Sequence, residues 1–301
     1  MLSRPWSDVR DFLVDDHSIW YSDGMTLRGV DIETNQVTAT IEAVGIPFAL
    51  GDGAVWTYNR KTQVITGVDT KTGQIRTQLA TQGRPYHHGS FTFGAGSIWQ
   101  FAYAGSLSLW QARFVDHPPL PSVIRRIDPS TKKVLAEIPV GLFNNEVDMG
   151  ISPYRIHFVA GAIWILGKSG IQPFLHPGHV APFVKRIDVE TSRVIATIPL
   201  SGTVASLMAS EQYLCQSYSD PLTPVYLDGG IWISLHCGRA RSALLKIDLQ
   251  TNQLDGGFSN FMPGVFEPAN YHVLVVSHPR LTVTGDSLWG FGVGAAIRFD
   301  F

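Results

Sequence analysis

A short phrase built around tryptophan recurs along the whole chain and constrains its fold more than any other feature. The phrase is a turn, a small or polar residue, an aliphatic residue and Trp, and its six copies end at Trp20, Trp56, Trp99, Trp164, Trp232 and Trp289. The spacing of roughly 36 to 68 residues, filled with strand and turn patterns, is typical of a β-propeller. Six copies predict an all-β, six-bladed propeller with four-stranded antiparallel blades.

A second phrase follows the first five tryptophans and consists of an apolar residue, Asp, two variable residues and Thr. Its Asp and Thr pairs are Asp31 and Thr34, Asp69 and Thr72, Asp128 and Thr131, Asp188 and Thr191, and Asp248 and Thr251. Short polar side chains of this kind bond back to local amides in turns. The pairs are therefore predicted to be structural, in the turn between the third and fourth strands. The tryptophans are predicted to pack between blades.

The fourth repeat shows four short segments that alternate in hydropathy and are rich in β-branched residues. These predicted strands are Arg155–Val159, Ala162–Leu166, Val184–Asp188 and Arg193–Ile198. The sixth repeat ends with its third strand, Ala296–Phe301. We expect the residues before Val9 to supply its fourth strand, so that the N-terminal strand closes the ring and removes an open sheet edge.

Composition and charge narrow the classes of partner. The repeat spans all 301 residues, which predicts a single domain, 1–301, and the net charge of −2 argues against broad nucleic-acid binding. No apolar run approaches the ~18 residues of a membrane span, and the N-terminal segment lacks the apolar core of a signal peptide. We therefore expect a cytoplasmic protein with no nucleic-acid or membrane partner, and Cys215 and Cys237 as free thiols.

The repeat also resembles a known group of proteins. The alternation of Gly-x-Ile-Trp with Ile-Asp-x-x-Thr-x-x-Val-x-Ala-x-Ile-Pro is similar to the bacterial propellers with YVTN-type repeats and the streptogramin-lyase-like group. The similarity covers nearly the whole chain. It implies a propeller that is either a metal-dependent lyase, using His and carboxylates, or a plain binding module. No motif carries those functional residues across one by one.

Long connections are expected on one side of the predicted propeller, where the second strand joins the third and where one blade joins the next. They are residues 101–122, 139–154, 167–182, 199–222 and 256–279. Loops longer than ~12–15 residues in compact domains are usually functional or disordered. Their many aromatic and apolar residues favour a half-covered cavity.

Alternation along the first strand of each repeat predicts which residues line that cavity. Positions six and eight before Trp are mostly apolar and are predicted to pack between blades, so positions seven and nine are predicted to face a central channel. The channel positions include Arg155, His157 and Arg280, with Asp11 in the same layer. Two guanidinium groups suit a carboxylate or phosphate, whereas in a solvated channel they would simply pair with Asp11.

The candidate site combines these arginines with acid–base groups, since neutral imidazoles can move protons near pH 7. The candidate catalytic residues are His88, His157, His278, Glu146 and Asp148. The candidate substrate-binding residues are Arg155, Arg280, Asp11, Tyr86 and Tyr154.

A metal site is a separate hypothesis. The segment His176-Pro-Gly-His179 holds two imidazoles, and His236 or His117 from an adjacent loop would complete a three-histidine site. The Pro-Gly pair rules out the helical spacing that presents two ligands on one face, so the pattern is not specific for a metal. We expect either no cofactor or a single divalent metal.

The leading functional hypothesis is a lyase, isomerase or cyclase that acts on a small organic anion at one end of the channel. Arginine would anchor the charged group and histidine would move the proton. The alternatives are a non-catalytic propeller that binds a ligand or protein, and a histidine-ligated metalloenzyme. No glycine pattern for a dinucleotide, a phosphate loop or a nucleophile elbow is present.

Overall fold

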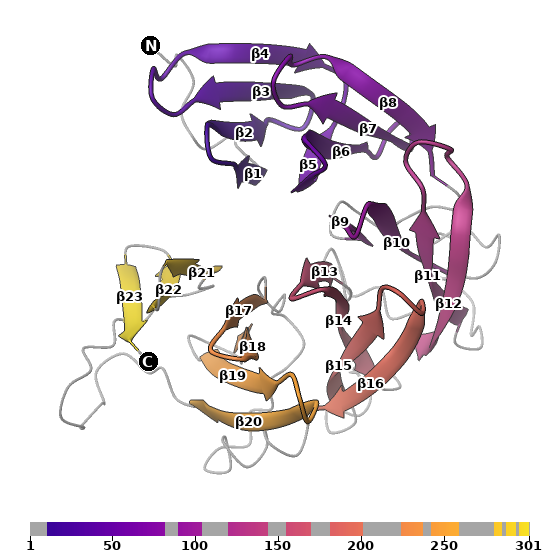
Figure 1. Cartoon of the computed structure of the whole chain (residues 1–301), viewed down its shortest axis with the longest axis vertical. Coiled ribbons are helices and arrows are strands. Elements are labelled where there is room, and N and C mark those ends of the chain that lie inside the picture. The colour runs from indigo at the N-terminus through magenta and orange to yellow at the C-terminus, as the bar shows by residue number, and fades with distance from the viewer. Residues whose placement is uncertain are drawn as a thin grey trace, which may run out of the picture. The chain divides into compact units, whose positions relative to one another are not determined.

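A computed structural model describes residues 11–81, 90–103, 120–143, 155–169, 181–200, 224–236, 242–258, 280–284, 287–292 and 295–300. Its strands form six antiparallel sheets, named A to F in chain order (Figure 1). Sheets A to E have four strands and sheet F has three, and in each sheet the strands lie side by side in sequence order. Adjacent antiparallel strands joined in this way form the meander that a propeller blade requires.

The strand bounds follow the repeat closely. Sheet A contains β1 (Asp11–Val14), β2 (Ser18–Ser22), β3 (Thr26–Asp31) and β4 (Val37–Glu42), and sheet B contains β5 (Ile46–Gly51), β6 (Ala54–Asn59), β7 (Val64–Asp69) and β8 (Ile75–Ala80). Sheet C contains β9 (Phe91–Gly94), β10 (Ser97–Tyr103), β11 (Leu120–Ile127) and β12 (Val134–Phe143). Sheet D contains β13 (Arg155–Val159), β14 (Ala162–Ser169), β15 (Ala181–Asp188) and β16 (Arg193–Pro199). Sheet E contains β17 (Val225–Leu227), β18 (Gly230–His236), β19 (Ser242–Asp248) and β20 (Gln253–Phe258), and sheet F contains β21 (Arg280–Thr284), β22 (Ser287–Gly292) and β23 (Ala295–Asp300).

The strands predicted for the fourth repeat are confirmed. β13 has the predicted bounds, and β14, β15 and β16 continue one to three residues past them, so the long connections are shorter than expected. β23 confirms the third strand predicted for the sixth repeat and begins and ends one residue earlier than predicted. Sheet F has no fourth strand within the described residues. Residues 1–10 lie outside that part of the chain, so ring closure by the N-terminal strand stays a prediction.

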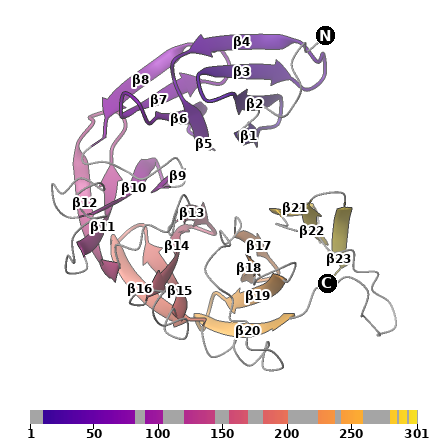
Figure 2. The same cartoon turned by 180° about the vertical axis from the view of Figure 1, so that it is seen from behind.

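The chain divides into two compact units, which are described separately. One unit contains sheets A to C and the other contains sheets D to F. Within the first unit, β5 lies close along both β1 and β9, as Figures 1 and 2 show from opposite sides. The prediction of a single domain stays a prediction.

Two-residue turns join the first and second strands of sheets B to E. Both residues of each turn have positive φ: Asp52 and Gly53, Ala95 and Gly96, Ala160 and Gly161, and Asp228 and Gly229. Positive φ at both positions characterises the type I′ turn, whose twist matches that of the flanking strands. The recurring glycine before the Trp phrase is thus a requirement of the hairpin.

The turns between third and fourth strands confirm the structural role of the Asp and Thr pairs. In sheet D, Asp188 Oδ1 accepts bonds from the backbone N–H of Thr191 at 2.7 Å and from its hydroxyl at 2.6 Å. The other four turns repeat both bonds. The residue four positions after each Asp has φ between 53° and 67°. The carboxylate therefore holds a turn that ends in a left-handed residue.

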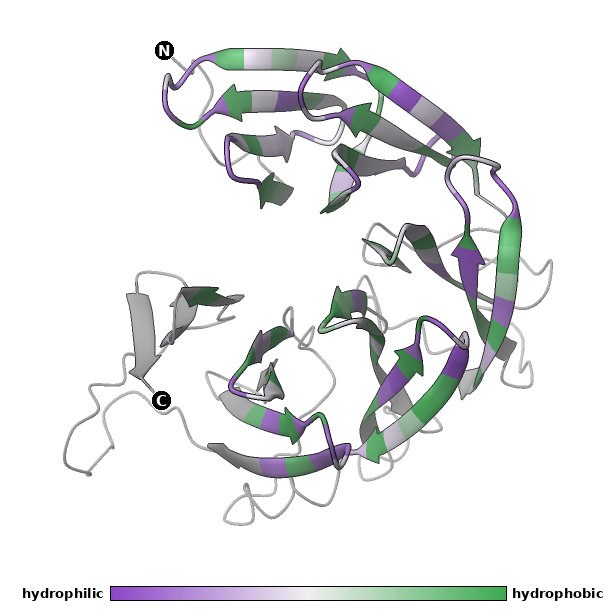
Figure 3. Ribbon diagram, viewed as in Figure 1, coloured by the Kyte–Doolittle hydropathy of each residue, from purple (hydrophilic) through white to green (hydrophobic). Residues whose placement is uncertain are grey.

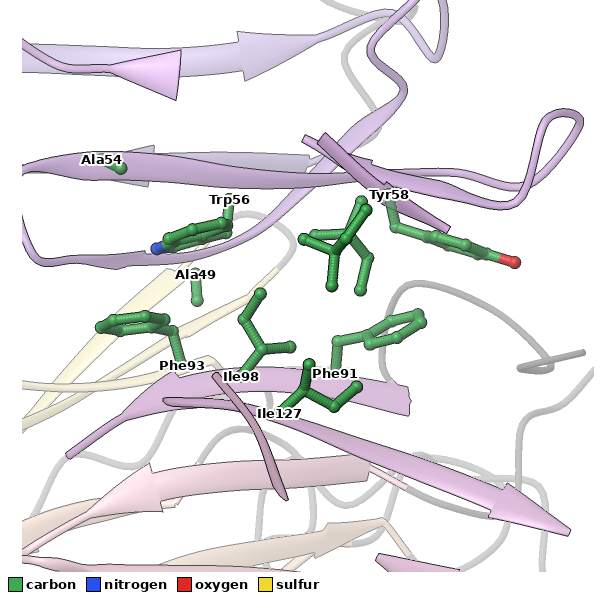
Figure 4. Close-up of a cluster of buried hydrophobic side chains, with 10 residues drawn as sticks. Ala49, Ala54, Trp56, Tyr58, Phe91, Phe93, Ile98 and Ile127 are labelled. Atoms are coloured by element: carbon green, nitrogen blue, oxygen red, sulfur yellow. The ribbon is translucent and has the colours of Figure 1, made fainter. Parts of the chain in front are cut away.

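The tryptophans pack between consecutive sheets, as predicted. We call the side of each sheet that carries Trp its Trp face and the other side its aliphatic face. Trp20 clusters with Val55 and Val68 of sheet B, and Trp164 clusters with Ile231 and Ile247 of sheet E. Figure 4 shows the same arrangement around Trp56, which packs toward Phe93 and Ile98 of sheet C. Each Trp face thus buries the aliphatic face of the next sheet in these pairs.

The outermost strands carry an alternating pattern that leaves one side to solvent. Along β8, Thr77 is half-buried and Leu79 is buried between exposed neighbours, and hydrophilic residues lie between the hydrophobic ends of the strand (Figure 3). Leu79 is buried in the cluster around Trp56, whereas Ile75 at the start of the strand is exposed. The core therefore lies between the sheets and thins toward the fourth strands.

Acid should weaken these turns. Hydrogen bonds from Ser130 and Thr131 lower the pKa of Asp128 from 3.8 to about 2, and similar bonds lower the pKa of Asp31, Asp69, Asp188 and Asp248. Because the pKa of Asp128 is lower in the folded chain, its carboxylate stabilises the fold fully at pH values above the unfolded-state pKa of 3.8. This contribution is lost as the pH falls from 3.8 toward about 2. The urea midpoint should drop steeply over this range. In Asp128→Asn the drop should be shallower; an identical pH profile would contradict the assignment.

The left-handed turn position predicts two opposite effects on stability. Gly73 has φ +67° and a Cβ there would lie 2.8 Å from Ala39 Cβ, so Gly73→Ala should lower the free energy of unfolding by about 1–2 kcal/mol. Lys132 has φ 60°, so Lys132→Gly should raise that free energy by up to about 1 kcal/mol. Chemical denaturation of both variants measures the difference. Equal effects of the same sign would refute the proposed strain.

Candidate functional site

On the first strand of sheets A and B, the residues predicted to face a channel instead pack beside the tryptophan. The residue seven positions before Trp pairs directly with Trp across the two strands, as Leu13 does with Trp20 and Ala49 with Trp56. Directly opposed residues share one face of a sheet. Leu13 packs against the Trp20 cluster and Ala49 belongs to the Trp56 cluster. The prediction that this position faces a channel is therefore wrong for both residues.

The opposite positions also depart from the prediction in sheet A. Phe12 and Val14, expected to be packed, are 48% and 53% exposed. In sheet C, by contrast, Phe91 and Phe93 are buried as expected. Sheet A is the first sheet of its unit, so no sheet of that unit precedes it to cover the side with Phe12 and Val14, whereas sheet B covers the equivalent side of sheet C.

In each sheet, Trp belongs to a row of side chains that crosses three strands. On the third strand, Gly29 and Gly67 leave room for the rings of Trp20 and Trp56. Sheets C, D and E place a cation there instead: Arg126 lies 5.3 Å from the Trp99 centroid, Arg186 lies 5.5 Å from that of Trp164, and Lys246 lies 5.7 Å from that of Trp232. These contacts are favourable cation–π interactions.

The row in sheet D consists of His157, Trp164 and Arg186 on adjacent strands. The first-strand positions of the six rows are Leu13, Ala49, Thr92, His157, Val225 and Thr282, of which only His157 has an ionisable side chain. The imidazole is half-buried and its Nε2 atom is buried. An ionisable group thus stands where sheets A and B place a packed aliphatic side chain.

Arg186 ties this row to the next sheet. Its Nη1 donates to the backbone oxygen of Leu249 and to Asn252 Oδ1, both at 2.8 Å, in the turn between β19 and β20. Trp164 Nε1 donates to the Val159 carbonyl at 3.1 Å. The indole that is paired with His157 and the guanidinium that lies over this indole are therefore both fixed in position.

The cations of sheet D do not gather on one side. Arg186 shares the Trp face with His157, whereas Lys185, its neighbour along β15, pairs across the strands with Ile165. Burial lowers the pKa of Lys185, whose ammonium lies 5.6 Å from the Phe183 ring centroid. Arg186 therefore contributes a fixed positive charge on the face that carries His157.

The junction of sheets D and E differs from that of sheets B and C at its first-strand end. In the B–C junction, Phe93 stacks on Trp56 with ring centroids 5.2 Å apart, and a Cβ on Gly51 would overlap the Phe93 ring. The equivalent of Gly51 in sheet D is Val159, and the equivalent of Phe93 in sheet E is Tyr226. Phe93 is 8% exposed and Tyr226 is 49% exposed. Tyr226 was expected to pack between blades, so this expectation is wrong.

A steric difference explains the exposure of Tyr226. Val159 packs against the Trp164 cluster and fills the space that glycine leaves open in sheet B. An aromatic ring at position 226 cannot stack on Trp164 in the way that Phe93 stacks on Trp56.

The other predicted site residues are described only in part or not at all. Arg155 begins β13 and pairs through its backbone with Leu166, Arg280 begins β21 opposite Phe291, Asp11 begins β1 opposite Ser22, and His236 ends β18 opposite Ser242. His88, His278, Glu146, Asp148, Tyr86, Tyr154, His176 and His179 lie outside the described residues. Cys215 and Cys237 also lie outside them.

The described residues contain neither a cluster of metal ligands nor a helix that could span a membrane. No group of three or more His, Cys, Asp or Glu side chains that could hold a metal occurs in the described ranges. Across the same residues, the structure has no helix of the length and apolarity needed to cross a membrane.

Comparison with solved structures supports a β-propeller fold. The chain is similar to hydrazine synthase of Kuenenia stuttgartiensis, with a TM-score of 0.56, 12% identity, and coverage of 92% of this chain and 70% of that one. It is also similar to the Pan2 WD40 domain of Neurospora crassa, with a TM-score of 0.56, 13% identity, and coverage of 98% and 76%. No protein-family model and no curated protein matches the chain. At these identities the likeness concerns the fold alone, and the chain is a β-propeller protein.

Proposed function

We propose that the chain binds a small organic anion where the first strands of sheets D and E meet, at one end of the D–E junction. His157 would transfer a proton to or from this anion. The observation that carries this proposal is the position of His157 opposite Trp164, where the corresponding residues of sheets A and B are packed aliphatic side chains. The half-buried imidazole lies on the face of sheet D that packs toward sheet E, so it is a candidate acid–base group for a ligand bound there.

Arginine would supply the charge that holds the anion. Arg155 lies two residues before His157 on β13, about 6.6 Å along the strand, so one small ligand spans both. A guanidinium fork binds a carboxylate or phosphate through two hydrogen bonds. Arg280 has the equivalent position in sheet F, outside the D–E junction, and remains a candidate anchor from the sequence.

The chemistry suited to these groups is lyase, isomerase or cyclase chemistry. A neutral imidazole would remove a proton from the carbon beside the anionic group, and the guanidinium would stabilise the charge that develops there. Such a reaction needs no redox cofactor. His88, His278, Glu146 and Asp148 remain candidates for the second acid–base group, and Asp11, Tyr86 and Tyr154 remain candidates for further substrate contacts.

Three other assignments from the sequence are also proposals. The repeat phrases support kinship with the YVTN-type and streptogramin-lyase-like propellers and a six-bladed ring closed by the N-terminal strand. A single divalent metal at His176, His179 and His236 is the alternative to a metal-free site. A cytoplasmic location fits the composition.

A binding scaffold is the second candidate function. Several large apolar side chains are exposed in the first unit, among them Met25, Val37, Ile75 and Leu135. Val37, Ile75 and Leu135 lie on the outermost strands β4, β8 and β12, where apolar side chains are accessible to a protein partner. A scaffold would use these residues and would leave His157 without a role.

Ligand binding tests the proposal directly. Isothermal titration with a panel of small carboxylates and phosphates should identify an anion that binds. Arg155→Met should weaken that binding by about 2–5 kcal/mol, because a charge-assisted pair is lost in a partly dry site. His157→Ala should lower turnover, followed by NMR of the bound compound, more than it lowers affinity.

Matched substitutions separate the site from general effects of charge. Arg193 and His17 are exposed elsewhere in the described chain, so Arg193→Met and His17→Ala should leave binding and turnover unchanged. If no anion binds, or if the control substitutions act as strongly as those at the site, the anion site does not exist and the scaffold function is favoured.

A further inference from the structure

We infer that Tyr226 contacts the ligand of this junction and that the ligand carries a flat, aromatic group beside its anionic group. This inference rests on the proposed anion site at His157 and extends it to the class of compound. Tyr226 is not among the residues that the sequence marks as functional, because its position in the repeat is an apolar packing position.

The register places Tyr226 and His157 at the same end of one junction. Tyr226 pairs with Ile231, which belongs to the cluster that buries Trp164, and His157 pairs with Trp164 itself. The two residues therefore lie on the two faces that pack together in the D–E junction. In the B–C junction the equivalent residues, Phe93 and Ala49, belong to one buried cluster.

Burial changes abruptly along this face of sheet E. Ile231 and Ile233 are fully buried, whereas Tyr226, beside Ile231 on the neighbouring strand, is half exposed. Val159 prevents the ring from stacking on Trp164 as Phe93 stacks on Trp56. An exposed aromatic ring thus stands at the edge of a dry core, next to the ionisable row.

The chemistry of this pair defines the ligand. A phenol ring offers a flat apolar face for stacking and a hydroxyl that donates and accepts hydrogen bonds. The imidazole of His157 and the guanidinium proposed for Arg155 supply polar and positive groups. An aromatic carboxylate or an aryl phosphate could contact both the Tyr226 ring and the polar and positive groups. A short aliphatic acid could contact only the polar and positive groups.

Paired ligands and variants test the inference. Affinities of benzoate and phenyl phosphate should be compared with those of acetate and methyl phosphate by isothermal titration. In Tyr226→Ala, binding of the aromatic anions should weaken roughly tenfold, as expected for loss of a ring contact, while the aliphatic anions bind unchanged. Tyr226→Phe keeps the ring and should retain most of the aromatic preference. Phe12, which is 48% exposed on β1, provides the control Phe12→Ala.

The outcomes separate this inference from the proposed function. If aromatic and aliphatic anions bind equally and Tyr226→Ala changes neither, the inference is wrong and the anion site stands. If no anion binds the native chain, both are wrong. If Phe12→Ala lowers aromatic binding as much as Tyr226→Ala does, the ring contact lies elsewhere and the inference is again wrong.

Discussion

Packing of the repeated tryptophan against the aliphatic face of the next sheet is the interaction on which the rest of this structure depends. No single sheet buries its own two faces, so each one is stabilised by its neighbours, as in other repeat architectures. Trp20, Trp56 and Trp164 form the centres of three such junctions. The Asp and Thr turns and the type I′ hairpins then fix the strand lengths that bring each indole into place.

The residues paired with the tryptophan on the first and third strands differ from one sheet to the next. On the third strand, glycine admits the indole in sheets A and B, and a cation covers it in sheets C, D and E. On the first strands, the D–E junction has His157 and Tyr226 where the B–C junction has the buried Ala49 and Phe93. The exchange leaves apolar ring surface in solvent, which is the kind of cost in stability that functional sites commonly carry.

The architecture could be predicted from the sequence because its signals are local. Positive φ in the hairpins requires glycine, the Asp carboxylate reaches a Thr three residues away, and both patterns recur at fixed places. β13 to β16 consequently match the predicted strands. The comparisons support the propeller fold and give no support to a particular family.

The site was predicted less well because it depends on contacts between sheets. Alternation along β13 identifies His157 as unusual, yet it cannot show that the residue shares a face with Trp164 and faces sheet E. Tyr226 was missed because its exposure is decided by Val159, which belongs to another repeat 67 residues earlier in the sequence. Only a comparison of the two residues across one junction reveals the substitution of valine for glycine.

Chemical nitration of Tyr226 in Val159→Gly measures this dependence most directly. With glycine in sheet D, as in sheet B, the ring has space to stack on Trp164, so nitration of Tyr226 by tetranitromethane, followed by peptide mass spectrometry, should slow several-fold and anion binding should fall. Tyr58, buried in the B–C junction, serves as the internal reference, and Val37→Gly at an exposed strand position should leave nitration of Tyr226 unchanged. Equal nitration of Tyr226 in the native chain and in Val159→Gly would contradict the steric origin of the open junction.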